Sequence, residues 1–434
     1  MNRTSLMAAP RRLIRGPRAL EAWALLLAGV LPALLLFKRG LAETTLGLFV
    51  LAGLAFAWRW REAAWLRQPW LYAALALSGV LLLLAPFSID PGESAQAALI
   101  SWRWPVFAAL LAWFFLARPQ RLRIFEMGVM VVLAFVVLDG FWQYLTGTDV
   151  FGIPRHSANR LTGPFNDPLI GTFTDRLWFI ALALLWFVML RRHAALAVLG
   201  LLGVSSLGAL FIFLTGERAA FLVFVLGTAV VVLGVFLRLP RWRWPLVGAA
   251  LAMTIMVTAL AATQPKMVDR TVHSTVDAIV HLDKNVYGLN LITGWEQFRE
   301  NPLTGVGARQ FQAYCQAQMP EALAAYRELG VPECVIHPHN LYMGMLAEGG
   351  VIGFVLFVLM LGLLFRAFFQ QERASGEPQE LRAFFASSLL LVTFWPVQPS
   401  MEYFNGWTAA VVWMGVGWGL ARSRLACASA AAGP

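Results

Sequence analysis

Two histidines near the start of an apolar run carry the clearest signal for chemistry in this sequence. His337 and His339 precede residues 341–365, so we predict that they lie at the N-terminus of a helix. A neutral histidine can act as a general base near pH 7, and a helix N-terminus favours an anionic ligand. We interpret His339 as the catalytic candidate and His337 as a substrate-binding neighbour. The alternatives are a pair that caps the helix and a metal site. The metal site is disfavoured because no cysteine or acidic ligand set converges on the pair in sequence.

Arginines at the ends of apolar runs form a second set of candidates. Arg103, Arg176 and Arg218 fall at or inside these ends, where an arginine is costly unless it is used or paired. A guanidinium group binds phosphate through two parallel hydrogen bonds, so the set predicts a phosphate-bearing ligand near the membrane surface. The alternatives are anchoring to anionic lipid head groups and local pairing, of Arg176 with Asp175 or of Arg218 with Glu217.

The apolar runs that must position these residues make up most of the chain. It has 434 residues, of which 59% are hydrophobic and 13% are charged, whereas an average soluble domain is about 25% charged. The pattern favours membrane-spanning helices over a barrel, which would have short alternating strands. We therefore predict an all-α polytopic membrane protein with about twelve transmembrane helices. The twelve runs are residues 21–37, 44–58, 70–85, 97–117, 124–145, 169–190, 194–214, 219–237, 244–262, 341–365, 383–397 and 406–420.

Basic residues predict how these helices are oriented. Arginines concentrate in alternate short loops and in both terminal segments, and acidic residues concentrate in the other loops. Because basic residues favour cytoplasmic loops, we predict cytoplasmic termini and a multi-pass protein of the bacterial inner membrane. The basic start of the chain has no cleavage site for a signal peptide, so the first run is expected to be a retained helix. The same distribution accounts for the net charge of +10 and argues against a nucleic-acid partner.

The predicted helices divide the chain into four parts. Residues 1–262 hold the first nine helices, residues 263–340 form a periplasmic segment, residues 341–421 hold the last three helices, and residues 422–434 form a cytoplasmic tail. A shorter periplasmic segment is expected at residues 146–168. Most of the chain outside the membrane is therefore expected in one segment between helices nine and ten.

The segment 263–340 is long enough to form a layer outside the membrane. Helical stretches are predicted at residues 290–300 and 320–329. The segment also holds Cys315 and Cys334, two of the three cysteines. In an oxidising periplasm these two can form a disulfide, which would stabilise the fold by about 3 kcal/mol. Two free thiols are the alternative.

Four blocks of sequence resemble those of the O-antigen ligase and polymerase superfamily of bacterial membrane glycosyltransferases. Each block alone is a weak signal, and their order and placement together are fairly specific. With the predicted topology, the resemblance covers essentially the whole chain and implies a GT-C-like fold. The blocks are RLTGPF at 160–165, LTGERAA at 214–220, Trp295 with ENPLTGVG at 300–307 and Phe311, and HNLY at 339–342 with AEGGVIG at 347–353.

The resemblance implies an enzyme that acts without a metal or a nucleotide cofactor. Its donor would be an O-antigen glycan linked to undecaprenyl pyrophosphate, and its acceptor a sugar hydroxyl of lipid A–core, both presented in the membrane. His339 would take the proton of the hydroxyl, and Arg218, with Arg160 and Arg309, would stabilise the pyrophosphate. A single displacement would invert the anomeric centre. Glu348 in the tenth predicted helix would either orient His339 or pair with a buried arginine.

One departure from the family pattern concerns a second arginine. Family members often carry an arginine shortly before the tryptophan of the third block, and residues 287–294 contain none. Arg309 and Arg270 are the preferred candidates for the second arginine of the site, ahead of Arg299. Four glycines in the tenth predicted helix indicate close helix packing. They are Gly344, Gly349, Gly350 and Gly353.

Three other functions compete with an O-antigen ligase. An O-antigen polymerase would use a second lipid-linked glycan as the acceptor. A protein O-oligosaccharyltransferase of the same superfamily often has a longer C-terminal region, which argues mildly against it. A transporter or lipid flippase would be expected to have repeated halves, and the single dominant segment at 263–340 argues against repeats.

Overall fold

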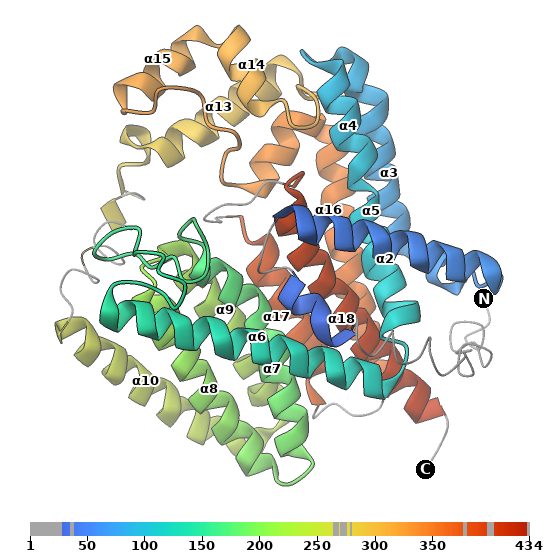
Figure 1. Cartoon of the computed structure of the whole chain (residues 1–434), viewed down its shortest axis with the longest axis vertical. Helices are drawn as coiled ribbons and strands as arrows, with labels where there is room; N and C mark the ends of the chain where they lie inside the picture. Colours follow the sequence, from blue (N-terminus) through green and yellow to red (C-terminus); the bar gives the residue numbers. More distant parts are fainter. Residues whose placement is uncertain are drawn as a thin grey trace.

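The computed structural model describes residues 28–34, 39–263, 269, 276–277, 280–375, 380–396 and 403–431. Every regular element within these residues is a helix, which confirms the predicted all-α class (Figure 1). The longer helices pack into a bundle, and α13, α14 and α15 form a separate layer at one end of it (Figure 1). The helices are α2 (Arg39–Arg59), α3 (Pro69–Leu84), α4 (Pro91–Ser101), α5 (Arg103–Leu110), α6 (Pro119–Thr146), α7 (Ile170–Leu190), α8 (Ala194–Leu214), α9 (Arg218–Arg238), α10 (Arg243–Thr263), α13 (Val286–Glu300), α14 (Phe311–Gln318), α15 (Pro320–Glu328), α16 (Leu341–Ser375), α17 (Arg382–Phe394) and α18 (Gly406–Ala431).

Among the described residues, eight helical segments are long and apolar enough to cross a membrane. They coincide with the second to eighth predicted runs and with the tenth, and the fourth run corresponds to one segment, Pro91–Phe115, that combines α4 and α5. Predicted runs nine and twelve correspond to α10 and α18, and run eleven corresponds to the shorter apolar helix α17. The first run lies mostly outside the described residues, so the count of twelve stays a prediction. α18 continues past the predicted end at residue 420 to Ala431.

α7 is the central helix of the bundle. Most of its side chains, from Ile170 to Phe187, are buried, and it packs against α6, α8 and α17. Helices in a bilayer associate through close packing and hydrogen bonds between them. The N-terminus of α7 is therefore held in place by this packing, and it can position the segments of the chain that contact it.

The layer α13–α15 has its own small core and a disulfide. Cys315 and Cys334 are bonded, with their Cα atoms 6.1 Å apart, and both are buried with Tyr326. The Tyr326 hydroxyl group donates to Asn290 Oδ1 or Thr293 Oγ1 at 3.1 and 3.2 Å, and burial raises the pKa of Tyr326 to about 12. The predicted helical stretches at 290–300 and 320–329 are confirmed as parts of α13 and α15.

The layer is attached to the bundle where α16 is broken. Gly350 has φ 61° and ψ −166°, which interrupts the helix. The loop 302–307 runs along this break: Val306 N–H donates to Ala347 O at 2.9 Å, Gly307 N–H to Glu348 O at 3.0 Å, and Val351 N–H to Pro302 O at 2.9 Å. The third and fourth sequence blocks thus contact each other through their backbones, as ENPLTGVG lies on AEGGVIG.

We expect Gly350→Ala to destabilise the protein by about 1–3 kcal/mol, because alanine disfavours a positive φ. The added Cβ would also press against the Leu303 carbonyl group and the Gly305 nitrogen. The measurement is the melting temperature of the detergent-solubilised protein. Gly362→Ala in the same helix is the control, because its Cβ would meet nothing within 4 Å. An equal melting temperature for the two variants would contradict the role of the break.

Candidate active site

Arg218 opens α9 directly after the turn that ends α8. The residue before it, Glu217, is 3% exposed, and its carboxylate turns towards α7. Glu217 Oε1 accepts from Gly171 N–H at 2.5 Å, and Oε2 accepts from Thr172 N–H at 3.1 Å and from the Thr172 hydroxyl group at 2.6 Å. These bonds satisfy N–H groups that the first turn of α7 leaves open. The alternative of a local Arg218–Glu217 pair is therefore wrong: the carboxylate caps α7.

Arg218 is half-buried. Among the described residues, none forms a hydrogen bond or ion pair with its side chain. Its positive charge is thus held at the N-terminus of α9, where the helix dipole is also positive. Both features favour an anion at this position.

Arg160 lies beside the same turn. Leu161 N–H donates to Thr215 O at 3.1 Å, and a side chain at Gly216 would collide with the Asn159 carbonyl group. Burial raises the pKa of Glu217, while hydrogen bonds from Thr172 and Gly171 and the charge of Arg160 act in the opposite direction. The first and second sequence blocks are therefore brought together, and Arg160 is close enough to Glu217 for its charge to act on that carboxylate.

A buried glutamine holds the loop that carries Arg160. Gln143 Oε1 accepts from Thr162 N–H at 3.0 Å and from Gly163 N–H at 2.9 Å, and its Nε2 donates to Thr162 Oγ1 at 2.7 Å. Arg155 donates from Nε to Gln143 O at 3.0 Å, so its side chain joins the loop to the end of α6. Sequence reasoning missed Gln143. The available signal was a lone amide inside the apolar run 124–145.

Arg176 lies beneath this turn in α7. It is 2% exposed and near enough to Asp175 and Glu217 for their charges to act on it. Both carboxylate oxygens of Asp175 are buried without a hydrogen-bond partner among the described residues, so the pairing of Arg176 with Asp175 stays a prediction. The guanidinium group of Arg176 contributes to a buried charge cluster with Glu217.

We expect Glu217→Ala to destabilise the protein, because it leaves buried N–H groups of Gly171 and Thr172 without an acceptor. Each unsatisfied group costs about 1–3 kcal/mol. The check is the melting temperature, compared with Glu296→Ala. Glu296 pairs with Arg299 at 2.9 Å on an exposed face, so that variant is expected to melt like the unaltered protein. A normal melting temperature for Glu217→Ala would show that another group caps α7.

His337 and His339 lie immediately before α16, as predicted. The cap is formed by Asn340, whose Oδ1 accepts from Tyr342 N–H and Met343 N–H, both at 3.0 Å; capping by the histidines, the alternative, is therefore wrong. The imidazole rings of His337 and His339 are 4.6 Å apart between centroids. His339 has φ 54°, a left-handed conformation that non-glycine residues adopt rarely and often at functional sites.

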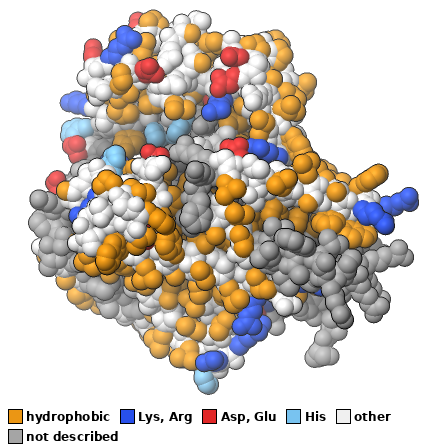
Figure 2. Space-filling view, in the orientation of Figure 1, with side chains coloured by type: hydrophobic (Ala, Val, Ile, Leu, Met, Phe, Trp, Pro, Cys, Tyr) orange, Lys and Arg blue, Asp and Glu red, His pale blue; other side chains and the backbone are white. Residues whose placement is uncertain are grey.

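The environment keeps His337 neutral at pH 7. Burial, followed by the charge of His339, lowers the pKa of His337 to about 3. Neither ring nitrogen of His337 has a hydrogen-bond partner among the described residues. Tyr287 of α13 adds a third ring, 6.2 Å from that of His339; sequence reasoning missed this neighbour. Figure 2 shows a hollow between the layer α13–α15 and the bundle, with histidine side chains around it.

The remaining candidates lie in different places. Glu348 is buried and its Oε1 accepts from Phe311 N–H at 3.3 Å, which links α16 to α14. Arg309 Nε lies 3.8 Å from Glu93 Oε1 at the start of α4. Arg103 Nη2 pairs with Glu43 Oε2 at 2.8 Å, between α5 and α2. Arg270 lies outside the described residues. Within the described residues, no group of three or more histidine, cysteine or acidic side chains could hold a metal ion.

The chain was compared with known protein families. Residues 203–358 match the model of a family described as O-Antigen ligase. The matched stretch includes the turn before Arg218, the layer α13–α15 and the start of α16 with His339. No curated protein matches the chain.

Proposed function

We propose that this chain, of which residues 203–358 match the O-antigen ligase family model, transfers an O-antigen glycan from undecaprenyl pyrophosphate to a sugar hydroxyl group of lipid A–core. The eight long apolar helices make it a multi-pass membrane protein. The observation that carries the proposal is that the family match spans both the Arg218 turn and the His339 turn. These turns hold the cation and the base that this transfer requires.

The proposed reaction is one displacement at the anomeric carbon of the donor glycan. The acceptor oxygen forms a bond to that carbon as the bond to the pyrophosphate oxygen breaks, and the configuration inverts. His339 takes the proton of the acceptor hydroxyl group. Undecaprenyl pyrophosphate leaves with the electron pair, and its growing negative charge is stabilised by Arg218 and Arg160. The pyrophosphate is already a good leaving group, so charge stabilisation matters more than an acid.

The glycan donor and the acceptor would be bound on the periplasmic side. The disulfide between Cys315 and Cys334 supports this side for the layer α13–α15, because disulfides persist in oxidising compartments such as the periplasm. The arginine-rich loops between the bundle helices would then face the cytoplasm. We propose the hollow between the layer and the bundle (Figure 2) as the place where the donor and the acceptor meet.

The test is the lipopolysaccharide of a strain that lacks the gene. A ligase predicts loss of all O-chain from lipid A–core, together with accumulation of lipid-linked polymer. A single O-unit on the core would instead identify a polymerase, for which a second lipid-linked glycan is the acceptor. Unchanged lipopolysaccharide would overturn both activities. Complementation with the unaltered gene is the control.

A further inference from the structure

A basic pocket lies at the end of the bundle opposite to the layer α13–α15. It has a volume of about 570 Å³ and lies among the start of α6, the end of α7, the start of α17 and the end of α18. Figure 1 shows the end of α18 far from α13–α15, so this pocket is separate from the proposed active site. None of its lining residues belongs to the candidate catalytic set.

The pocket carries an excess of positive charge. Five arginines line it against two glutamates. Glu126 Oε1 lies 2.8 Å from Arg422 Nη2, and Glu380 pairs with Arg382. The lining residues therefore have a formal excess of three positive charges. The five are Arg123, Arg191, Arg192, Arg382 and Arg422.

Arg422 is held firmly in the pocket. Its Nη2 donates to Glu126 Oε2 at 2.9 Å, and its guanidinium carbon lies 4.0 Å from the centre of the Phe187 ring. Trp418 Nε1 donates to Glu126 Oε1 at 2.8 Å, which fixes the carboxylate. The Arg422 guanidinium group is therefore preorganised, and an anion that binds it need not order a free side chain.

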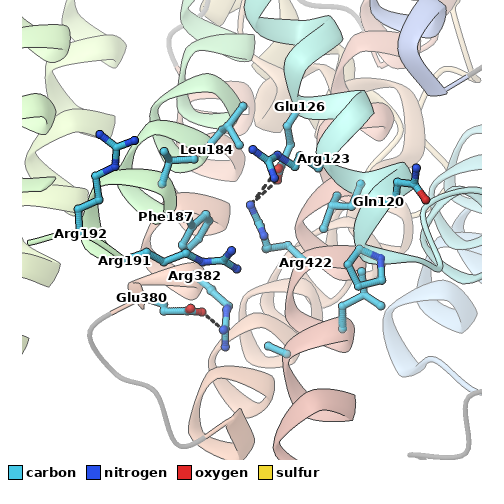
Figure 3. Close-up of a pocket in the computed structure, with 15 residues that line it drawn as sticks. Gln120, Arg123, Glu126, Leu184, Phe187, Arg191, Arg192, Glu380, Arg382 and Arg422 are labelled. Atoms are coloured by element: carbon cyan, nitrogen blue, oxygen red, sulfur yellow. Dashed lines mark hydrogen bonds and ion pairs between the residues drawn. The ribbon is translucent and has the colours of Figure 1, made fainter. Parts of the chain in front are cut away.

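Arg191 reaches into the same space. Figure 3 shows its guanidinium group near Phe187 and Arg382, whereas Arg192 points away. The positive charge of Arg191 acts unfavourably on Arg422. An anion between the two groups would remove this repulsion and could accept hydrogen bonds from both.

The rest of the pocket wall is apolar. Leu122, Leu184, Val188 and Leu425 line it together with the Phe187 ring. A free phosphate ion would leave this wall in contact with water, whereas a lipid would cover it with its glycerol and acyl groups. Basic pockets between membrane helices are suited to phosphate-bearing head groups.

We propose that this pocket binds the phosphate head group of an anionic membrane phospholipid. The phosphate lies between Arg191 and Arg422, and an acyl chain lies against the wall of Leu184, Phe187 and Leu425. The site is distinct from the donor and acceptor sites and does not depend on the proposed transfer reaction.

The test is native mass spectrometry of the full-length protein in detergent, titrated with phosphatidylglycerol or phosphatidylcholine of the same acyl chains. We expect selective binding of phosphatidylglycerol. In the double variant Arg123→Gln/Arg191→Gln we expect about 30-fold weaker binding, because each basic residue near an anionic lipid contributes a factor of about five. The control is Arg59→Gln/Arg241→Gln, which changes two exposed arginines outside the pocket and is expected to bind normally.

Three outcomes would overturn the proposal. The first is equal binding of the two lipids, and the second is equal loss of binding in the pocket and control variants. The third is full competition by inorganic phosphate at millimolar concentration, which would identify an ion site without a lipid. Equal melting temperatures of the two double variants exclude misfolding as the cause of lost binding.

Discussion

His339→Asn is expected to lower the rate of glycan transfer by about 10²–10⁴-fold, the usual contribution of a general base. Asparagine tolerates the left-handed backbone that His339 adopts (φ 54°) better than alanine does, so it removes the base with little backbone strain. Asn340, rather than His339, caps α16, so the helix start is retained. His339→Ala removes the same base and is expected to lower the transfer rate at least as much, with some additional loss of stability from the left-handed backbone. The measurement is transfer from lipid-linked glycan to lipid A–core in membrane vesicles.

The matched control for this variant is His281→Asn. His281 is an exposed histidine that lies 3.9 Å from Asp277, and its loss is expected to leave the rate unchanged. Equal protein levels in the membrane, measured by an epitope tag, are needed for the comparison. A rate for His339→Asn within about threefold of the unaltered protein would refute the base assignment.

The sequence was sufficient to predict most of the long helices that the structure describes, because the bilayer imposes a simple rule on them. A spanning segment must satisfy its backbone hydrogen bonds internally and present an apolar surface to the lipid. Such segments are visible in the sequence as long apolar runs, for example 124–145 and 169–190. The starts of α3, α4 and α6 also carry a proline, which suits the first helical turn. The helices of the layer followed from similarly local signals, whereas the sequence left the cysteine pair open between a disulfide and two free thiols.

The contacts that position the candidate site could not be predicted in the same way. Glu217 binds the start of α7, which lies 45 residues or more away in the chain, and Gln143 holds a loop about twenty residues away. Such bonds join a side chain to a distant backbone, and they have no period in the sequence. From the sequence, Gly350 is interpreted as a glycine that allows close helix packing. In the structure it breaks α16, and the backbone of Leu303 and Gly305 leaves no room for a Cβ atom there.

The basic pocket was missed for a different reason. Arg191 and Arg422 were used only as signals of membrane orientation, in which every loop arginine counts alike. The structure distinguishes one loop arginine from another. Arg422 is fixed by Glu126 and Phe187, whereas Arg192 points away from the pocket (Figure 3). Charge counting therefore predicts the side of the membrane, but only the packing of α6, α7 and α18 distinguishes a binding group from a topological signal.

The second large effect is expected for Arg218→Ala, which should lower the transfer rate by about 10²–10³-fold. This is the usual loss when one group that stabilises transition-state charge is removed. The leaving pyrophosphate gains charge as the bond breaks, so the loss should be larger in kcat than in KM for the lipid-linked donor. Glu217 is already bonded to Gly171 and Thr172, so removing Arg218 does not leave a carboxylate without partners and the fold should be retained.

Arg218→Lys separates the two parts of this argument. Lysine keeps the charge at the N-terminus of α9 but loses the planar fork that binds two phosphate oxygens, so we expect a rate between those of alanine and arginine. Arg327→Ala is the control, because Arg327 is exposed on α15 and its contact is with the Pro332 carbonyl group. If Arg218→Ala transfers glycan at the full rate, Arg218 has no role at the pyrophosphate. If lysine is no better than alanine, the two-point geometry of the guanidinium group is what the reaction needs, and Arg160 cannot supply it alone.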